Sequence, residues 1–172
     1  YLNQLQTILE HGVTKGDRTG VGTISYFGLQ ARYRMADGFP AVTTKKLVWK
    51  SMVSELLWFI SGSDNLNDLK RVYQHNKLWD ANYADYIKRT GGDDNGDMGR
   101  GVQWRRWRGP DGRETDQLEE AIELIRHNPD SRRIIVNAWN PTEASADDVA
   151  LPPCHSFFQF HVADGKLSLQ MY

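Results

Sequence analysis

The stretch HSFFQFHVADGKLSLQMY, residues 155–172, decides the fold class because it predicts a β-hairpin. We expect one strand over residues 155–162 and a second over residues 166–172, joined across Ala163-Asp164-Gly165. Immediately upstream, residues 132–139 predict a third strand. The C-terminal part of the chain is therefore expected to contain a β-sheet.

Helices are expected before this sheet. Residues 1–11 show an apolar face with helical spacing that ends at Gly12, residues 46–61 give the strongest helical pattern, and residues 115–127 give a further helix. In residues 46–61 the expected inward side comprises Val48, Met52, Leu56, Phe59 and Ile60. Residues 23–35, rich in β-branched and aromatic side chains, predict strands. Helices and strands alternate without a regular βαβ rhythm, so we expect an α+β fold with a mixed β-sheet packed by helices.

Composition limits the class of protein. The 172 residues suit one domain, and we expect a single domain over residues 1–172. A formal net charge of −1 argues against a dedicated nucleic-acid or membrane-surface binder. No apolar run approaches the roughly 20 residues of a membrane span, and the first residues lack signal-peptide features, so we expect a cytoplasmic protein. Because the sequence stops at Tyr172 within a predicted strand, we also expect it to be part of a longer chain.

Cys154 is the first candidate for chemistry, in the segment Leu151-Pro152-Pro153-Cys154-His155. A lone cysteine is most often a buried structural thiol. Here two prolines make the approach rigid, and we place Cys154 where a loop passes into a strand, a common position for catalytic groups. Neighbours on a strand point to opposite faces, so His155 is poorly placed to accept the thiol proton and is equally well explained as a structural histidine.

Arginines are the second candidates, because a guanidinium group binds phosphate well. Arg18 lies in a glycine-rich loop that does not match the P-loop pattern. Arg132 and Arg133 open a predicted strand, where they suit an anion or a solvated edge, and alternation predicts that their side chains diverge. A single cysteine is also too few for a zinc cage, and we expect no metal site.

Two further features each leave two interpretations open. Glu55 lies in the apolar pattern of residues 46–61, either on a polar edge or buried and hydrogen-bonded as a group that handles protons. Residues 103–108, QWRRWR, interleave basic and aromatic side chains, a pattern that can stack bases and contact phosphates. We do not expect nucleic acid to be the partner of a chain without net positive charge.

Taken together, the motifs of this chain resemble those of thymidylate synthases. The motifs occur in the family's order across nearly the whole chain: Asp17-Arg18-Thr19-Gly20, Phe39-Pro40-Ala41-Val42-Thr43-Thr44-Lys45, Glu55-Leu56-Leu57-Trp58-Phe59, Leu78-Trp79-Asp80, Gln103-Trp104-Arg105, Asp130-Ser131-Arg132-Arg133-Ile134, Ala138-Trp139-Asn140 and Pro153-Cys154-His155. No single motif suffices, but eight in order make the match highly specific.

The resemblance implies reductive methylation of dUMP to dTMP, in which Cys154 adds to carbon six of the uracil ring. Methylenetetrahydrofolate is the implied co-substrate and supplies both the one-carbon unit and the hydride. Glu55 matches the family's carboxylate in proton transfer. The implied substrate-binding residues are Arg18, Arg132, Arg133 and His155, and the implied folate-binding residues are Lys45, Trp79 and Asn82. A homodimer formed through the sheets is also implied, with Arg132 and Arg133 reaching into the partner's site.

The chain departs from the family pattern at two places. The segment Met98-Gly99-Arg100-Gly101-Val102-Gln103 is about two residues shorter than expected and lacks a tyrosine that assists proton removal from carbon five of the ring. Family members also continue past Tyr172 with residues that bind the nucleotide, so we expect a chain ending there to bind nucleotide weakly and to have negligible activity. The alternatives are a dCMP hydroxymethylase of the same fold, an inactive dimerising fragment and a nucleic-acid-binding module.

Overall fold

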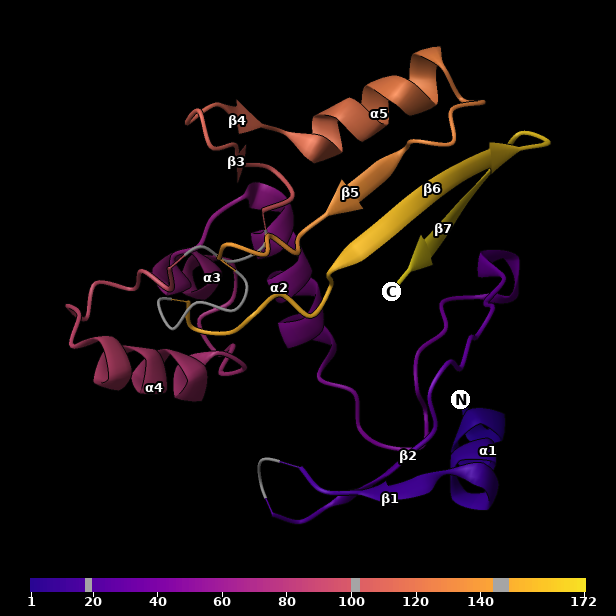
Figure 1. Cartoon of the computed structure of the whole chain (residues 1–172), viewed down its shortest axis with the longest axis horizontal. Helices are drawn as coiled ribbons and strands as arrows, with labels where there is room; N and C mark the ends of the chain where they lie inside the picture. Colours follow the sequence, from indigo (N-terminus) through magenta and orange to yellow (C-terminus); the bar gives the residue numbers. More distant parts are fainter. Residues whose placement is uncertain (18–19, 100–102, 144–148) are drawn as a thin grey trace. The chain divides into compact units, whose positions relative to one another are not determined.

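The chain forms two compact units, Tyr1–Leu47 and Val48–Tyr172. The computed structural model describes residues 1–17, 20–99, 103–143 and 149–172. Helices and small antiparallel sheets occur together, which agrees with the predicted α+β class (Figure 1).

The first unit begins with α1 (Leu2–His11), followed by the paired strands β1 (Val13–Lys15) and β2 (Thr23–Ser25). As predicted, α1 ends at Gly12, whose amide donates to the carbonyl of Ile8 at 2.8 Å. A Cβ at Gly12 would lie 2.4 Å from that carbonyl oxygen and 2.6 Å from a methyl of Ile24, so the turn from helix to strand has room only for glycine.

The strands predicted over residues 23–35 are mostly wrong. Only β2 forms, and a short 3₁₀ turn, η1 (Met35–Asp37), is the next regular element. The reason is that β propensity gives a strand only where a partner strand supplies hydrogen bonds, and β1 offers three residues, which pair with Thr23–Ser25.

The second unit contains the helices α2 (Trp49–Ser61), α3 (Leu66–Val72), α4 (Asp80–Thr90) and α5 (Gln117–His127). The helix predicted from residue 46 begins three residues later, at Trp49. It ends at Gly62, which adopts φ 73° and leaves no space for a side chain beside Cβ of Arg105. The pattern analysis did not find α4, although its inward residues Tyr83, Tyr86 and Ile87 follow helical spacing.

The predicted inward side of α2 is wrong in part. Phe59 is buried as expected, but Leu56 and Ile60 are 48% and 40% exposed. The helix instead buries Ser51 and Ser54, because Asn76 donates from Nδ2 to the carbonyl of Ser51 at 3.0 Å and to Oγ of Ser54 at 2.9 Å. These polar contacts fix the rotation of α2, which its apolar periodicity alone does not.

A three-stranded antiparallel sheet lies at the end of the chain, with order β5 (Ile135–Asn137), β6 (Phe157–Ala163), β7 (Lys166–Met171). The predicted hairpin is confirmed: Asp164 and Gly165 form its turn with φ 50° and 67°, the positive values that a tight two-residue turn requires. The strand predicted over residues 132–139 shrinks to β5, because β5 has three pairs with β6. A short ladder, β3 (Trp107–Arg108) with β4 (Glu114–Thr115), precedes α5.

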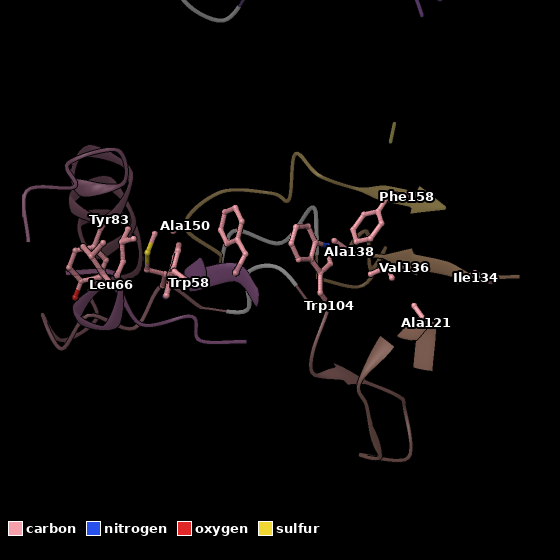
Figure 2. Packing of buried hydrophobic residues seen from close by; sticks show 13 residues of the cluster. Trp58, Leu66, Tyr83, Trp104, Ala121, Ile134, Val136, Ala138, Ala150 and Phe158 are labelled. Carbon is pink, nitrogen blue, oxygen red and sulfur yellow. The ribbon is translucent and has the colours of Figure 1, made fainter. Parts of the chain in front are cut away.

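The core of the second unit runs between the helices and this sheet. In Figure 2, Leu66 and Tyr83 lie at one end of the buried cluster, Ile134 and Val136 at the other, and Trp104 lies between them. Helix α5 packs against β5. The core therefore joins α2, α3 and α4 to the strands that flank Cys154.

Candidate active site

Cys154 lies in a bend and not at the first position of a strand, because β6 begins three residues later at Phe157. The argument from strand alternation therefore does not apply to Cys154 and His155. The thiol is exposed, and Sγ lies 3.8 Å from the carbonyl oxygen of Pro152. Exposure of the only cysteine excludes the interpretation of a buried structural thiol.

His155 is half-buried in an aromatic cluster. Its ring centroid lies 5.7 Å from that of Phe59 on α2 and 6.1 Å from that of Trp104, both edge-to-face. The next residue, Ser156, accepts from the amides of Ala138 and Trp139 at 2.8 and 3.3 Å through its carbonyl. The structure therefore orients His155 by ring packing, with Cys154 beside it on the accessible side.

Glu55 is half-buried and hydrogen-bonded, so it lies between the exposed polar edge and the fully buried position that the sequence left open. Its Oε1 accepts from the indole Nε1 of Trp79 at 2.6 Å. Trp79 in turn packs edge-to-face against Phe59, with ring centroids 6.2 Å apart. The imidazole of His155 thus packs directly against the ring of Phe59. The carboxylate of Glu55 is hydrogen-bonded to Trp79, which packs against the same ring.

Three further residues are predicted to bind ligands, and the structure describes two of them. Asn82 is half-buried on the first turn of α4, close in sequence to Trp79. Lys45 is exposed near the end of the first unit. Arg18 lies outside the described residues.

Arg132 and Arg133 occupy a turn before β5, so the prediction that they open the strand is wrong. Both are exposed, and within the described part of the chain neither guanidinium forms an ion pair. The backbone is nevertheless fixed, because Gln159 on β6 donates from Nε2 to the carbonyl of Arg132 at 2.9 Å. The hydrogen bond from Gln159 thus fixes the turn that carries these two cationic side chains, and both side chains are exposed to solvent.

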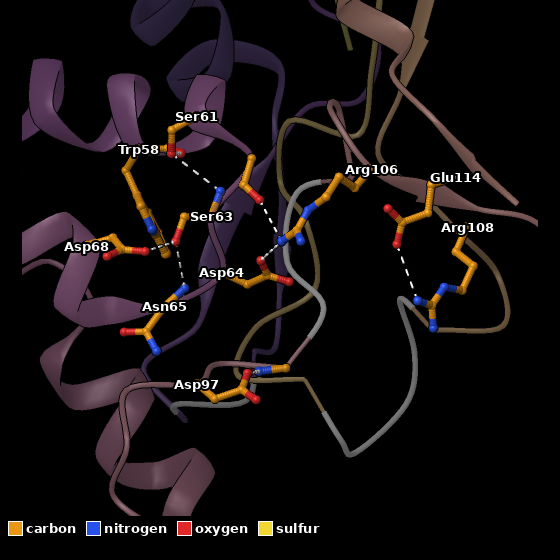
Figure 3. A network of polar contacts seen from close by, with 12 residues as sticks. Trp58, Ser61, Ser63, Asp64, Asn65, Asp68, Asp97, Arg106, Arg108 and Glu114 are labelled. Atoms are coloured by element: carbon orange, nitrogen blue, oxygen red, sulfur yellow. Dashed lines mark hydrogen bonds and ion pairs between the residues drawn. The ribbon is translucent and has the colours of Figure 1, made fainter. Parts of the chain in front are cut away.

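The arginines of residues 103–108 have partners within the fold. Arg105 pairs with Asp116 at 2.7 Å, Arg106 with Asp64 at 3.0 Å, and Arg108 with Glu114 at 3.3 Å. Figure 3 shows the last two pairs, and Arg106 also donates to the carbonyl of Gly62 at the end of α2. Arg105 and Arg106 thus bind the end of α2, through the carbonyls of Ile60 and Gly62, whereas Arg108 pairs across the β3–β4 ladder.

One comparison with known proteins decides the family. The family model described as thymidylate synthase matches residues 1–172. The chain belongs to the thymidylate synthase family. Thymidylate synthases are methyltransferases of dTMP synthesis that bind dUMP, use methylenetetrahydrofolate as co-substrate and are typically dimeric.

Among the residues that the structure describes, no group of three or more His, Cys, Asp or Glu side chains is arranged to hold a metal ion. Likewise, no helix in the described ranges has both the length and the apolar character needed to cross a bilayer.

The sequence pattern did not indicate that α4 contacts the segment that precedes Cys154. Arg89 in its last turn donates from Nη2 to the carbonyl of Val149 at 3.2 Å, a contact across 60 positions of sequence. The helical spacing of Tyr83, Tyr86 and Ile87, followed by Gly91 at φ 65°, was the available signal for the helix.

Proposed function

We propose that this protein catalyses the reductive methylation of dUMP to dTMP, with Cys154 as the nucleophile that bonds to carbon six of the uracil ring. The observation that carries the proposal is the exposed position of Cys154 between a rigid double-proline approach and a histidine oriented by aromatic packing. A cysteine attacks as its thiolate, and the sulfur must be able to reach the planar ring of the substrate. The exposed position of Cys154 meets this second requirement.

Addition of the Cys154 sulfur forms the S–C bond and moves an electron pair toward carbon five, which then becomes nucleophilic. Methylenetetrahydrofolate supplies the one-carbon unit and the hydride when bound. Carbon five bonds to the one-carbon unit, and loss of the carbon-five proton releases the folate nitrogen and leaves an exocyclic methylene. Hydride transfer to this methylene forms the methyl group, breaks the S–C bond to restore Cys154, and leaves dihydrofolate. In these steps the protein holds the uracil ring near the sulfur and transfers protons to and from the ring.

Glu55 is the proposed group for proton management. The 2.6 Å hydrogen bond from Trp79 fixes one carboxylate oxygen, and with it the direction in which the carboxylate faces. An enzyme speeds proton transfer when the group that accepts or donates the proton is already oriented before the reaction begins.

Trp79, Asn82 and Lys45 are the proposed folate-binding residues. The half-buried indole of Trp79 offers an apolar surface of the kind that a pterin ring packs against, and the half-buried amide of Asn82 offers polar contacts one turn away. Lys45 is exposed, as suits a cation that meets the glutamate tail. These side chains fit the chemistry of the co-substrate.

Phosphate binding is proposed for Arg18, Arg132 and Arg133, the last two acting in the site of a partner subunit of a homodimer. For Arg132 and Arg133 the support is their exposed position on a turn held by Gln159, with no ion pair to any other residue that the structure describes. His155 is proposed to contact the nucleotide beside Cys154.

Mass spectrometry of the intact protein tests the proposal. The protein in its full natural length is incubated with 5-fluoro-dUMP and methylenetetrahydrofolate, and we expect a stable covalent adduct. Cys154→Ser removes the nucleophile and must abolish the adduct, whereas Gln74→Ala, at an exposed position outside the sheet, must retain it. An unchanged mass for the wild-type protein, or an adduct that survives Cys154→Ser, contradicts the proposal.

A further inference from the structure

The segment that carries Cys154 is anchored at both ends. Downstream, the carbonyl of Ser156 accepts two amides from the chain after β5, as described above. Upstream, two consecutive backbone groups are bound: the carbonyl of Val149 accepts from Nη2 of Arg89, and the amide of Ala150 donates to the carbonyl of Met98 at 3.0 Å. Val149 and Ala150 are only 5% and 8% exposed, so this anchor lies inside the fold.

Between the upstream anchor and Cys154 the chain has little freedom. Only Leu151, Pro152 and Pro153 intervene, and the pyrrolidine rings fix φ at both prolines. Pro153 is also buried. A displacement at Val149 therefore passes to Cys154 because few backbone torsions are available to absorb it.

Arg89 is itself held in the orientation that this contact requires. Its Nε donates to Oδ2 of Asp85 one turn earlier at 3.0 Å, and its guanidinium carbon lies 6.0 Å from the ring centroid of Tyr86. The side chain is 36% exposed, so it is partly shielded from solvent. A charged donor held in this way makes a stronger hydrogen bond to a carbonyl than a neutral one does.

We propose that Arg89 is a positioning residue that sets the placement of Cys154 from helix α4. The inference rests on the proposed function, in which Cys154 is the nucleophile. Helix α4 begins directly after Trp79 and carries Asn82, so one rigid element joins two of the proposed folate-binding residues to the segment that bears the sulfur. Removing the contact loosens the sulfur without touching the groups proposed for phosphate.

Three variants on α4 test this inference. Arg89→Met keeps much of the stem and removes the donor, Arg89→Lys keeps a cationic donor, and Lys88→Met alters an exposed neighbour as the matched control. Three quantities are measured on the full natural protein: hydrogen exchange of the peptide covering residues 149–157, the dissociation constant for dUMP, and the rate of adduct formation at saturating 5-fluoro-dUMP and methylenetetrahydrofolate.

We expect Arg89→Met to speed hydrogen exchange in residues 149–157 and to slow adduct formation by about tenfold to a hundredfold, the loss that accompanies displacement of a reacting atom by an ångström. The dissociation constant for dUMP should stay unchanged, Arg89→Lys should recover part of the rate, and Lys88→Met should match the wild type. A general loss of stability predicts weaker dUMP binding and no recovery with lysine, so the pattern separates positioning from folding.

The failure of this inference differs from that of the proposed function. If the wild type forms the adduct and Arg89→Met forms it at the same rate, or if hydrogen exchange of residues 149–157 is unchanged, Arg89 does not position Cys154. If the wild type itself forms no adduct, the proposed function fails first and the inference fails with it.

Discussion

Replacement of Asn76 by alanine is expected to destabilise the second unit by about 3 kcal/mol. Asn76 is completely buried, and its side chain makes three hydrogen bonds: Nδ2 donates to the carbonyl of Ser51 and to Oγ of Ser54, and Oδ1 accepts from the amide of Leu78 at 3.0 Å. Each neutral hydrogen bond contributes about 1 kcal/mol net, and the partners left behind are themselves buried or part-buried. The Leu78 amide also precedes Trp79, so the same change loosens the hydrogen bond to Glu55.

The assay is urea unfolding followed by tryptophan fluorescence. All six tryptophans lie in the unit Val48–Tyr172, so their signal reports the unit that contains Asn76. A loss of 3 kcal/mol corresponds to a fall of about 6–12 °C in the melting temperature for a chain of this size. Gln74→Ala, at an exposed position two residues earlier, is the control and should change stability by less than about 0.5 kcal/mol.

A double-mutant cycle with Ser54→Ala sharpens this test, because the two side chains share one hydrogen bond of 2.9 Å. We expect a coupling energy of about 1 kcal/mol. If Asn76→Ala costs no more than Gln74→Ala, or if the coupling is zero, the polar contact between α2 and residue 76 does not hold the helix and the reasoning is refuted.

Two other outcomes follow from charge and symmetry. Burial raises the pKa of Tyr83 above its ordinary value, so the folded state binds the phenolic proton more tightly than the unfolded state. The contribution of Tyr83 to stability is complete below about pH 10 and is lost as the pH rises through the raised pKa. Urea unfolding at several pH values should show this alkaline loss in the wild type and in the control Tyr33→Phe, at an exposed position, but a flatter profile in Tyr83→Phe. Equal profiles for the wild type and Tyr83→Phe would contradict this expectation. In subunit mixing, a Cys154→Ser protein combined one to one with an Arg132→Ala protein should regain activity in about a quarter of all sites, because each mixed dimer has one intact site if Arg132 acts on its partner. Activity no greater than the sum of the two separate proteins would exclude that arrangement.

Local patterns were sufficient where the structure depends on neighbours in sequence. The end of α1 at Gly12 and the hairpin turn at Asp164-Gly165 depend on backbone conformations that few residues adopt, and both were predicted correctly. The family also follows from the sequence, because ordered motifs between residues 17 and 155 carry it, and the family model matches residues 1–172. Cys154 and Glu55 became candidates on residue type and place in the chain alone.

Other features depend on partners that pattern analysis does not locate. Strand propensity over residues 23–35 gave only β2, because strand length depends on the hydrogen bonds that β1 supplies. The rotation of α2 follows from buried polar contacts with Asn76, which apolar spacing does not report. Helix α4 was missed since its mean hydropathy is low and its inward residues are partly aromatic.

By itself the sequence determined the chemistry available to this protein: one thiol, a carboxylate in an apolar helix, a set of arginines and the family to which they belong. The tertiary structure alone decided which of these groups meet. Glu55 and Trp79 lie 24 positions apart and Arg89 and Val149 lie 60 apart, yet each pair forms a hydrogen bond. The physical reason is that a hydrogen bond needs two atoms within about 3 Å, and only the packing of distant segments around one core brings them to that distance.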